Sequence, residues 1–272
     1  MSEPDPYFLG YRHAEQERLQ QQAEQMAPEA CWLLDQIALP AGARVIEIGC
    51  GPQGCLEILA ERVGPAGSVV GVERSKDAVA LARRFVGDRG LAHVEVLNAD
   101  ARTTGLPRAS FDLATARLVL VNVPDPAEIV AEMTPLVRPG GTVALHEADW
   151  ICHVCDPPLP EWTRLRELLE TYSAMNGIDL FIGRRAARLL RAAGLVDTRV
   201  HPLVHVYPPG HGRRMILLDF VENLRQRLLE QSLIGERELN DLTQRLEHHL
   251  KDPDTLVVSH LFFQAWGRKP AQ

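Results

Sequence analysis

Short apolar segments alternate with longer amphipathic segments through the first half of the chain. The apolar segments have the length of buried strands and are Ala43–Ile48, Ser68–Glu73, Val94–Asn98, Phe111–Arg117 and Thr142–Glu147. Apolar residues recur at helical spacing in the segments between them, which are Cys55–Val63, Lys76–Gly87 and Pro126–Val137. Strands separated by helices are typical of βαβ units, whose parallel sheet is covered on both faces. The pattern therefore predicts a doubly wound α/β core.

The segments on either side of this core are mostly helical. Residues 12 to 38 predict two helices broken at Pro28, because proline is tolerated only in the first turn of a helix. Beyond residue 150, helices are expected over Pro160–Met175, Gly183–Ala193, Arg213–Gln231 and Glu236–Leu250. Two strand-like segments, Thr198–Tyr207 and Leu256–Trp266, lie among these helices, and we expect the second to close the edge of the sheet.

Charge and composition narrow the class of partner. The chain has 272 residues, a formal net charge of −7 and a pI of about 5.8, which disfavours a nucleic-acid backbone as the partner. No apolar run reaches the length of about 18 residues that spans a membrane. The first residues do not resemble a signal peptide, and five irregularly placed cysteines disfavour a disulfide framework. We therefore expect a cytoplasmic protein with reduced thiols.

A glycine-rich loop follows the first predicted strand. Gly49, Gly51 and Gly54 fit the pattern G-x-G-x-x-G, and Glu73 ends the second strand, where that fingerprint has its ribose-binding acid. Glycines let the chain turn sharply and let a ligand approach the backbone, while the following helix N-terminus attracts negative charge. The loop predicts a nucleotide-like cofactor and leaves two classes open, a nicotinamide dinucleotide and S-adenosylmethionine.

Two acidic residues favour S-adenosylmethionine. Glu47 lies inside the strand just before the glycine loop, where a pyrophosphate needs no acid but an ammonium or a sulfonium is attracted by one. Asp100 ends the third strand, where it is placed to accept a hydrogen bond from an adenine amino group. The chain also lacks a recognisable Tyr-x-x-x-Lys pair, which disfavours a nicotinamide-dependent oxidoreductase.

The chain resembles the class I S-adenosylmethionine-dependent methyltransferases. The resemblance rests on five segments, which stand in the family's order: Val45–Gly51, Val70–Glu73, Asn98–Ala101, Phe111–Ala114 and Leu136–Gly141. It is strongest to the small-molecule branch, which contains ubiquinone and menaquinone methyltransferases, and to bacterial natural-product enzymes with an N-terminal segment like Tyr11–Leu19. The resemblance implies a Rossmann-like, mostly parallel seven-stranded sheet.

The same resemblance divides the chain into three parts within one overall domain. Residues 1–40 would form an N-terminal helical lid segment, and residues 41–150 the cofactor-binding α/β core. Residues 151–272 would complete the sheet and carry helical inserts that cap the substrate.

The resemblance also implies which residues hold the cofactor. The methionine part would be held by Glu47 and the loop from Gly49 through Cys50 to Gly51, the ribose by Glu73, the adenine by Asp100 and Ala101, and the ammonium by the backbone carbonyl of Arg117. Tyr11 and Arg18 would pair with the cofactor carboxylate. Arg74 and Asn122 complete the predicted cofactor set, and Asn122 replaces a histidine that is common in the quinone branch.

Candidate catalytic residues stand at the end of the fifth predicted strand. Methyl transfer from a sulfonium is an in-line displacement, so the protein mainly aligns the reacting atoms. A hydroxyl acceptor would also need a base, and His146 and Glu147 are the candidates. Strand alternation places these two side chains on opposite faces of the sheet. Oxygen, nitrogen and carbon acceptors all stay open.

One further motif, the C-x-x-C segment Cys152–Cys155, raises the alternative of a metal site. Cys152 and Cys155 flank His153, but one C-x-x-C without a second pair is weak support for zinc, so metal-free chemistry is expected.

The apolar faces of the late helices suit a lid over a hydrophobic or aromatic small molecule in secondary metabolism, and they also suit a homodimer contact. Two other functions stay open: a nicotinamide-dependent oxidoreductase, and a binding or non-methylating protein that retains the fold.

Overall fold

The fold is built on one large sheet. The computed structural model describes residues 13–271. The strands of the large sheet are β1 (Arg44–Ile48), β2 (Ser68–Glu73), β3 (Val94–Asn98), β4 (Phe111–Arg117), β5 (Val137–Asp149), β7 (Val196–Leu203) and β9 (Leu261–Arg268). Their order across the sheet is β3-β2-β1-β4-β5-β9-β7. The pairs among β1 to β5 are parallel and β9 is antiparallel to both its neighbours, which confirms the predicted mostly parallel seven-stranded sheet.

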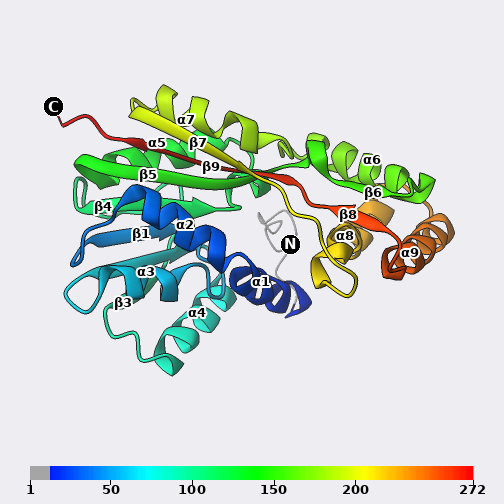
Figure 1. Ribbon diagram of the computed structural model, residues 1–272, viewed down its shortest axis with the longest axis horizontal. Helices are drawn as coiled ribbons and strands as arrows, with labels where there is room; N and C mark the ends of the chain where they lie inside the picture. The colour runs from blue at the N-terminus through cyan, green and yellow to red at the C-terminus, as the bar shows by residue number, and fades with distance from the viewer. Residues whose placement is uncertain (1–12, 272) are drawn as a thin grey trace.

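Helices cover both faces of this sheet, as the doubly wound prediction requires. One face carries α2 (Ala27–Ile37), α3 (Leu56–Val63) and α4 (Lys76–Asp88), and the other carries α5 (Pro126–Leu136) and α7 (Ala186–Ala192) (Figure 1). Successive side chains of β1 point to opposite faces of the sheet and so contribute to both helix layers. Val45 packs into the cluster that includes α2 and α3, while Ile46 packs into the cluster that includes α5.

The remaining elements gather beyond one end of the sheet, at the right in Figure 1. They are α1 (His13–Gln25), α6 (Pro160–Met175), α8 (Ile216–Glu230), α9 (Glu236–Lys251) and the two-stranded sheet of β6 (Val154–Asp156) and β8 (Leu256–Val258). Short 3-10 helices connect some of these elements: η1 (Leu120–Asn122), η2 (Trp150–Cys152), η3 (Ile182–Arg185) and η4 (Gly212–Met215). In residues 13–271 no helix combines the length and the apolarity needed to cross a membrane.

The expectation for the last strand is wrong in two respects. The segment predicted as one strand over Leu256–Trp266 forms two strands, β8 and β9, and β9 lies inside the sheet while β7 forms its edge. The break falls at Ser259, whose hydroxyl accepts from the His205 N–H at 2.9 Å and donates to the His260 carbonyl at 2.6 Å. Such side-chain bonds to the backbone compete with a strand ladder. The side chains of β9 are mostly buried, as in an interior strand, whereas those of β7 are largely exposed. β7 also contains Pro202, which is favoured in an edge strand because proline has no N–H to donate to a second neighbour.

Candidate cofactor and acceptor site

A cavity of about 310 Å³ lies where β1, β2, β4 and β5 end. This is the end of an open α/β sheet at which ligands bind. Every predicted cofactor residue that the structure describes lines this cavity: Arg18, Glu47, Gly49, Cys50, Gly51, Glu73, Arg74, Asp100, Ala101, Arg117 and Asn122. Tyr11 lies outside the described residues.

The three glycines of the loop differ in what a side chain at each position would contact. All have positive φ, +67° at Gly49, +57° at Gly51 and +55° at Gly54, a conformation that costs other residues energy. A Cβ on Gly54 would lie 2.6 Å from the Glu47 carboxylate, and one on Gly49 would lie 2.6 Å from Val119. A Cβ on Gly51 would meet nothing within 4 Å. Gly49 and Gly54 therefore allow close packing, while Gly51 leaves open space beside the backbone.

Glu47 ties the loop to the helix that follows it. Its carboxylate is buried, and both oxygens accept from the Cys55 N–H at 2.9 Å, immediately before α3 begins. Burial raises the pKa of Glu47 to about 7, against the opposing effects of the Arg117 cation and the Cys55 N–H. A cationic ligand group beside this carboxyl would favour its ionised form.

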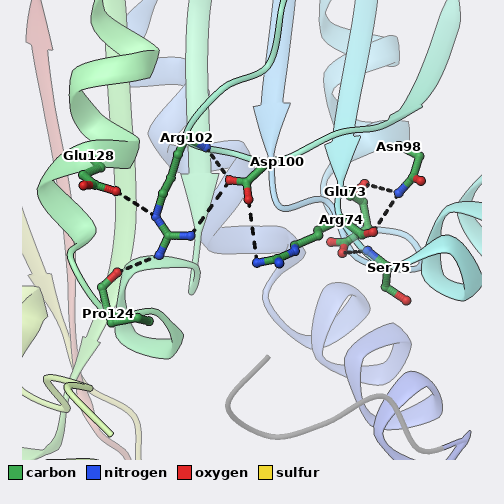
Figure 2. A network of polar contacts seen from close by, with 8 residues as sticks. All are labelled: Glu73, Arg74, Ser75, Asn98, Asp100, Arg102, Pro124 and Glu128. Atoms are coloured by element: carbon green, nitrogen blue, oxygen red, sulfur yellow. Dashed lines mark hydrogen bonds and ion pairs between the residues drawn. The ribbon is translucent and has the colours of Figure 1, made fainter. Parts of the chain in front are cut away.

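Glu73 braces the loop from the second strand. One of its oxygens accepts from the Gly51 N–H at 3.0 Å and the other from the Ser75 N–H at 2.8 Å. Asn98, at the end of β3, donates to the backbone carbonyls of Glu73 and Arg74 at 3.1 and 2.7 Å (Figure 2). Burial raises the pKa of Glu73. The predicted ribose-binding carboxylate is thus held rigidly at the cavity wall.

Asp100 is the centre of the polar network in Figure 2. Its carboxylate accepts from the Arg102 N–H at 2.8 Å and lies 3.7 Å from the Arg74 guanidinium. The Arg102 side chain reaches the other way, donating to the Pro124 carbonyl at 2.9 Å and pairing with Glu128 at 3.1 Å. The network holds the predicted adenine-binding residue in place between two arginines.

Two predicted arginines differ in how far they are already engaged. Arg18 pairs with Glu15 at 2.6 Å and donates to Gln22 at 2.9 Å, so its pairing with the cofactor carboxylate stays a prediction. Arg117 donates to the Gly54 carbonyl at 3.1 Å through Nη2, while its buried Nη1 has no hydrogen-bond partner in the part of the chain that the structure describes. A guanidinium N–H beside the glycine loop is therefore available to a ligand.

Neither candidate base lines the cavity. Glu147 is fully buried, its carboxylate accepts from the N–H groups of residues 119 to 121 at 3.0 to 3.2 Å, and burial raises its pKa to about 8. His146 is buried with its ring edge-to-face with Phe262 at 5.8 Å, and burial lowers its pKa to about 3. Their catalytic role stays a prediction, and the structure gives Glu147 a clear task in fixing the backbone of the cavity wall.

The cavity residues Trp150, Arg213, Phe220, His260 and Phe262 are called the cap below, and sequence reasoning did not single out three of them, Arg213, His260 and Phe262. Trp150, the first residue of η2 directly after β5, stacks on Phe220 of α8 with ring centroids 5.8 Å apart. Phe262 of β9 adds a third aromatic face, and Arg213 and His260 add polar ones. No local motif marks these residues, because they come from separate elements that only the fold brings together.

The Cys-x-x-Cys segment lies in and beside the apolar core. Cys155 is buried, and His153 packs between Trp162 at 4.5 Å and His260 at 4.0 Å, measured between ring centroids. Within the described part of the chain, no three His, Cys, Asp or Glu side chains are grouped so that they could hold a metal ion.

Comparisons with known proteins agree with this geometry. Residues 46–145 match the model of a methyltransferase domain. The chain is 31% identical over 159 residues to aklanonic acid methyltransferase DauC of Streptomyces sp. (strain C5), covering 58% of this chain and 72% of that protein. The chain belongs to the class I S-adenosylmethionine-dependent methyltransferases. S-adenosylmethionine is therefore its cofactor, and the carboxylates and glycine loop of the cavity fit that molecule's cations and ribose.

Other relatives within this methyltransferase family differ in length. Nocamycin O-methyltransferase of Saccharothrix syringae is 34% identical over 189 residues, which cover 63% of this chain and 66% of that protein. An uncharacterized 37.1 kDa protein in transposon TN4556 of Streptomyces fradiae is 34% identical over 186 residues, 68% of this chain. The chain spans about half, 52%, of the length of that transposon protein.

A solved structure shows the same fold. Phosphoethanolamine N-methyltransferase 2 of Haemonchus contortus, in complex with S-adenosyl-L-methionine, superposes with a TM-score of 0.58 at 19% identity. The match covers 89% of this methyltransferase and 52% of the Haemonchus chain. It confirms the class I methyltransferase architecture that the sequence predicted.

Proposed function

We propose that this methyltransferase transfers a methyl group to a hydrophobic or aromatic small molecule of secondary metabolism, by in-line displacement without a metal. One observation carries the proposal: a single continuous cavity joins the glycine loop and its carboxylates to an apolar wall built by the cap. Apolar cavities with a few polar groups are typical of sites for small organic molecules. The names of two relatives, which refer to aklanonic acid and nocamycin, support an organic acceptor.

The residues of this chain have separate tasks in the proposed reaction. S-adenosylmethionine supplies an electrophilic methyl group on a positively charged sulfur. We assign the methionine part to Glu47 and the open backbone at Gly51, the ribose to Glu73 and the adenine to Asp100. The aromatic cap would hold the acceptor and exclude water, so that its nucleophilic atom lies in line with the methyl group.

The direct test is a search for a methylated product. The purified protein is incubated with S-adenosylmethionine bearing a deuterated methyl group and a panel of phenols, enols, carboxylic acids and amines on fused aromatic rings. We expect mass spectrometry to detect a labelled product for at least one acceptor, with one S-adenosylhomocysteine per product, and addition of a chelator to leave the rate unchanged. The Glu73→Ala variant serves as a low-affinity control.

Two outcomes would contradict the proposal. Binding of S-adenosylmethionine without any labelled product would favour a non-methylating protein that retains the fold. Loss of activity in the chelator that returns on adding a divalent metal would contradict metal-free transfer.

A further inference from the structure

Arg213 brings a buried positive charge to the cap side of the cavity. It lies in η4, is 8% exposed and lines the cavity. Its Nε donates to the Tyr207 hydroxyl at 2.9 Å, and its guanidinium lies 5.6 Å from the ring centroid of Phe262. Its buried Nη1 has no hydrogen-bond partner among the described residues 13–271. Across residues 13–271, no acidic side chain forms an ion pair with it, although an unpaired buried charge is costly.

The next residue shows what a purely structural arginine looks like in the same turn. Arg214 is 1% exposed, and its guanidinium donates four hydrogen bonds to backbone carbonyls. The acceptors, at 2.7 to 3.0 Å, are the carbonyls of Tyr207, Leu250, Asp252 and Thr255. Arg214 therefore ties β8 and the end of α9 to the turn. Arg213 has no such task, so its open N–H is not a requirement of folding.

The titratable neighbours of Arg213 in this part of the cavity include two buried imidazoles, His153 and His260. His260 lines the cavity at 3% exposure, and its ring centroid lies 4.0 Å from that of His153. Its Nε2 has no hydrogen-bond partner within residues 13–271. Burial, the neighbouring imidazole and the Arg213 charge hold the pKa of His260 well below its ordinary value. Burial and nearby arginines likewise lower the pKa of His153 to about 3. Near neutral pH these imidazoles are uncharged, and Arg213 adds a positive potential between apolar walls.

The cofactor has a different cation within reach. Arg117 lies beside Glu47 and Gly54 at the glycine loop, with a buried N–H that has no hydrogen-bond partner in residues 13–271. Arg213 lies instead among the aromatic side chains of the cap. The charge on Arg213 is therefore placed for the other ligand of the cavity.

We propose that Arg213 binds an anionic oxygen of the methyl acceptor, and that the acceptor is an apolar aromatic acid. The oxygen belongs to a carboxylate, which pairs with Nη1 while the rings lie against Trp150, Phe220 and Phe262. The His260 imidazole offers a second hydrogen-bonding group beside it. This inference rests on the proposed methyl transfer to an apolar small molecule and narrows its substrate class.

The test compares two probes that differ by one carboxylate. The protein is loaded with S-adenosylhomocysteine, which prevents turnover, and titrated in a calorimeter with 1-hydroxy-2-naphthoate and with 1-naphthol. We expect the naphthoate to bind at least about tenfold more tightly, as a charge-assisted pair in a water-poor site would give. In Arg213→Met we expect the two affinities to become equal within about threefold, with that of 1-naphthol unchanged. Arg213→Lys should keep part of the preference.

Matched controls separate this role from folding. Arg245→Met removes the same charge from α9, where the side chain is 71% exposed, and should leave both probe affinities unchanged. All variants should bind S-adenosylhomocysteine as the wild type does. If Arg213→Met does not fold, Tyr207→Phe is the second variant, because it removes the hydroxyl that positions Nε. It should weaken binding of 1-hydroxy-2-naphthoate about threefold and leave the affinity for 1-naphthol unchanged.

The outcomes also distinguish this inference from the proposed function. Equal affinity of the two probes for the wild type, binding of neither probe, or a preference that survives Arg213→Met would overturn the role of Arg213. Failure of the wild type to bind S-adenosylhomocysteine would contradict the proposed function itself.

Discussion

The carboxylates on the cofactor side of the cavity and the cap residues Arg213 and His260 are engaged in opposite ways. On the cofactor side, Glu47 and Glu73 are held by backbone N–H groups of the same loop and strand ends. On the cap side, Arg213 and His260 each leave a buried nitrogen without a hydrogen-bond partner among the residues that the structure describes. Internal pairing makes a rigid cradle before any ligand arrives, whereas an unpaired group gains most from the ligand. The difference indicates a preformed cofactor site and an acceptor site that the acceptor completes.

The adjacent arginines give the sharpest test of this contrast. Arg214→Met removes the donor of four buried hydrogen bonds and should lower the free energy of unfolding by about 3 to 5 kcal/mol. Arg213→Met removes a charge that has no acidic partner among residues 13–271. This variant should change the free energy of unfolding by less than about 1 kcal/mol, or raise it. Urea denaturation of the two variants measures both values. A similar loss in both would contradict the distinction.

The second prediction concerns the rigidity of the cofactor loop. Gly54→Ala adds a Cβ that would lie 2.6 Å from the Glu47 carboxylate, and should cost about 2 to 4 kcal/mol of unfolding free energy. Gly51→Ala is the matched control, because its φ is nearly the same but its Cβ meets nothing within 4 Å, so about 1 kcal/mol is expected. Denaturation without cofactor gives the difference. Equal losses would show that the contact with Glu47 is unimportant.

The third prediction concerns the ribose assignment. Glu73→Ala should weaken binding of S-adenosylmethionine by roughly 1.5 to 3 kcal/mol, through loss of a ribose contact and of the brace on Gly51. Glu73→Gln keeps one acceptor oxygen and should lose about half as much. Calorimetric titration of both variants measures the losses, and unchanged affinity in Glu73→Ala would rule out this role.

The smallest expected effect is a pH dependence of stability. Burial raises the pKa of Glu147 from 4.5 to about 8, so the folded protein retains a proton that the unfolded chain has lost, and stability falls as pH rises towards 8. Glu47, with a pKa near 7, acts in the same direction. The buried histidines act oppositely, but only below pH 6.5, their ordinary pKa.

Between pH 6.5 and 8 we therefore expect the free energy of unfolding to fall by about 1 to 2 kcal/mol. Glu147→Gln should remove most of this decrease, because its amide does not titrate. Denaturation at the two pH values, in the same ionic strength, measures the change. A wild type and variant that decline equally would place the titration elsewhere.

The cofactor side could be predicted from sequence because its residues follow strand ends within a short stretch of chain. Gly49 to Gly54, Glu73 and Asp100 each stand directly after or at the end of an apolar strand, and parallel strands end together. Arg213 and His260 do not follow an apolar parallel strand in this way, because Arg213 lies in a 3-10 turn and His260 at the break between β8 and β9. The catalytic prediction for His146 rested on strand position alone, which cannot tell a buried neighbour of the cavity from its lining.

The most direct test of the account is a calorimetric comparison of three ligands with the wild-type protein in one buffer: S-adenosylmethionine, S-adenosylhomocysteine and NAD. A preformed methyltransferase cradle predicts that the first two bind with one site per chain and that NAD does not bind. Binding of NAD alone would contradict the cofactor assignment and favour an oxidoreductase, and binding of none of the three would contradict the claim that the cradle is complete before a ligand arrives.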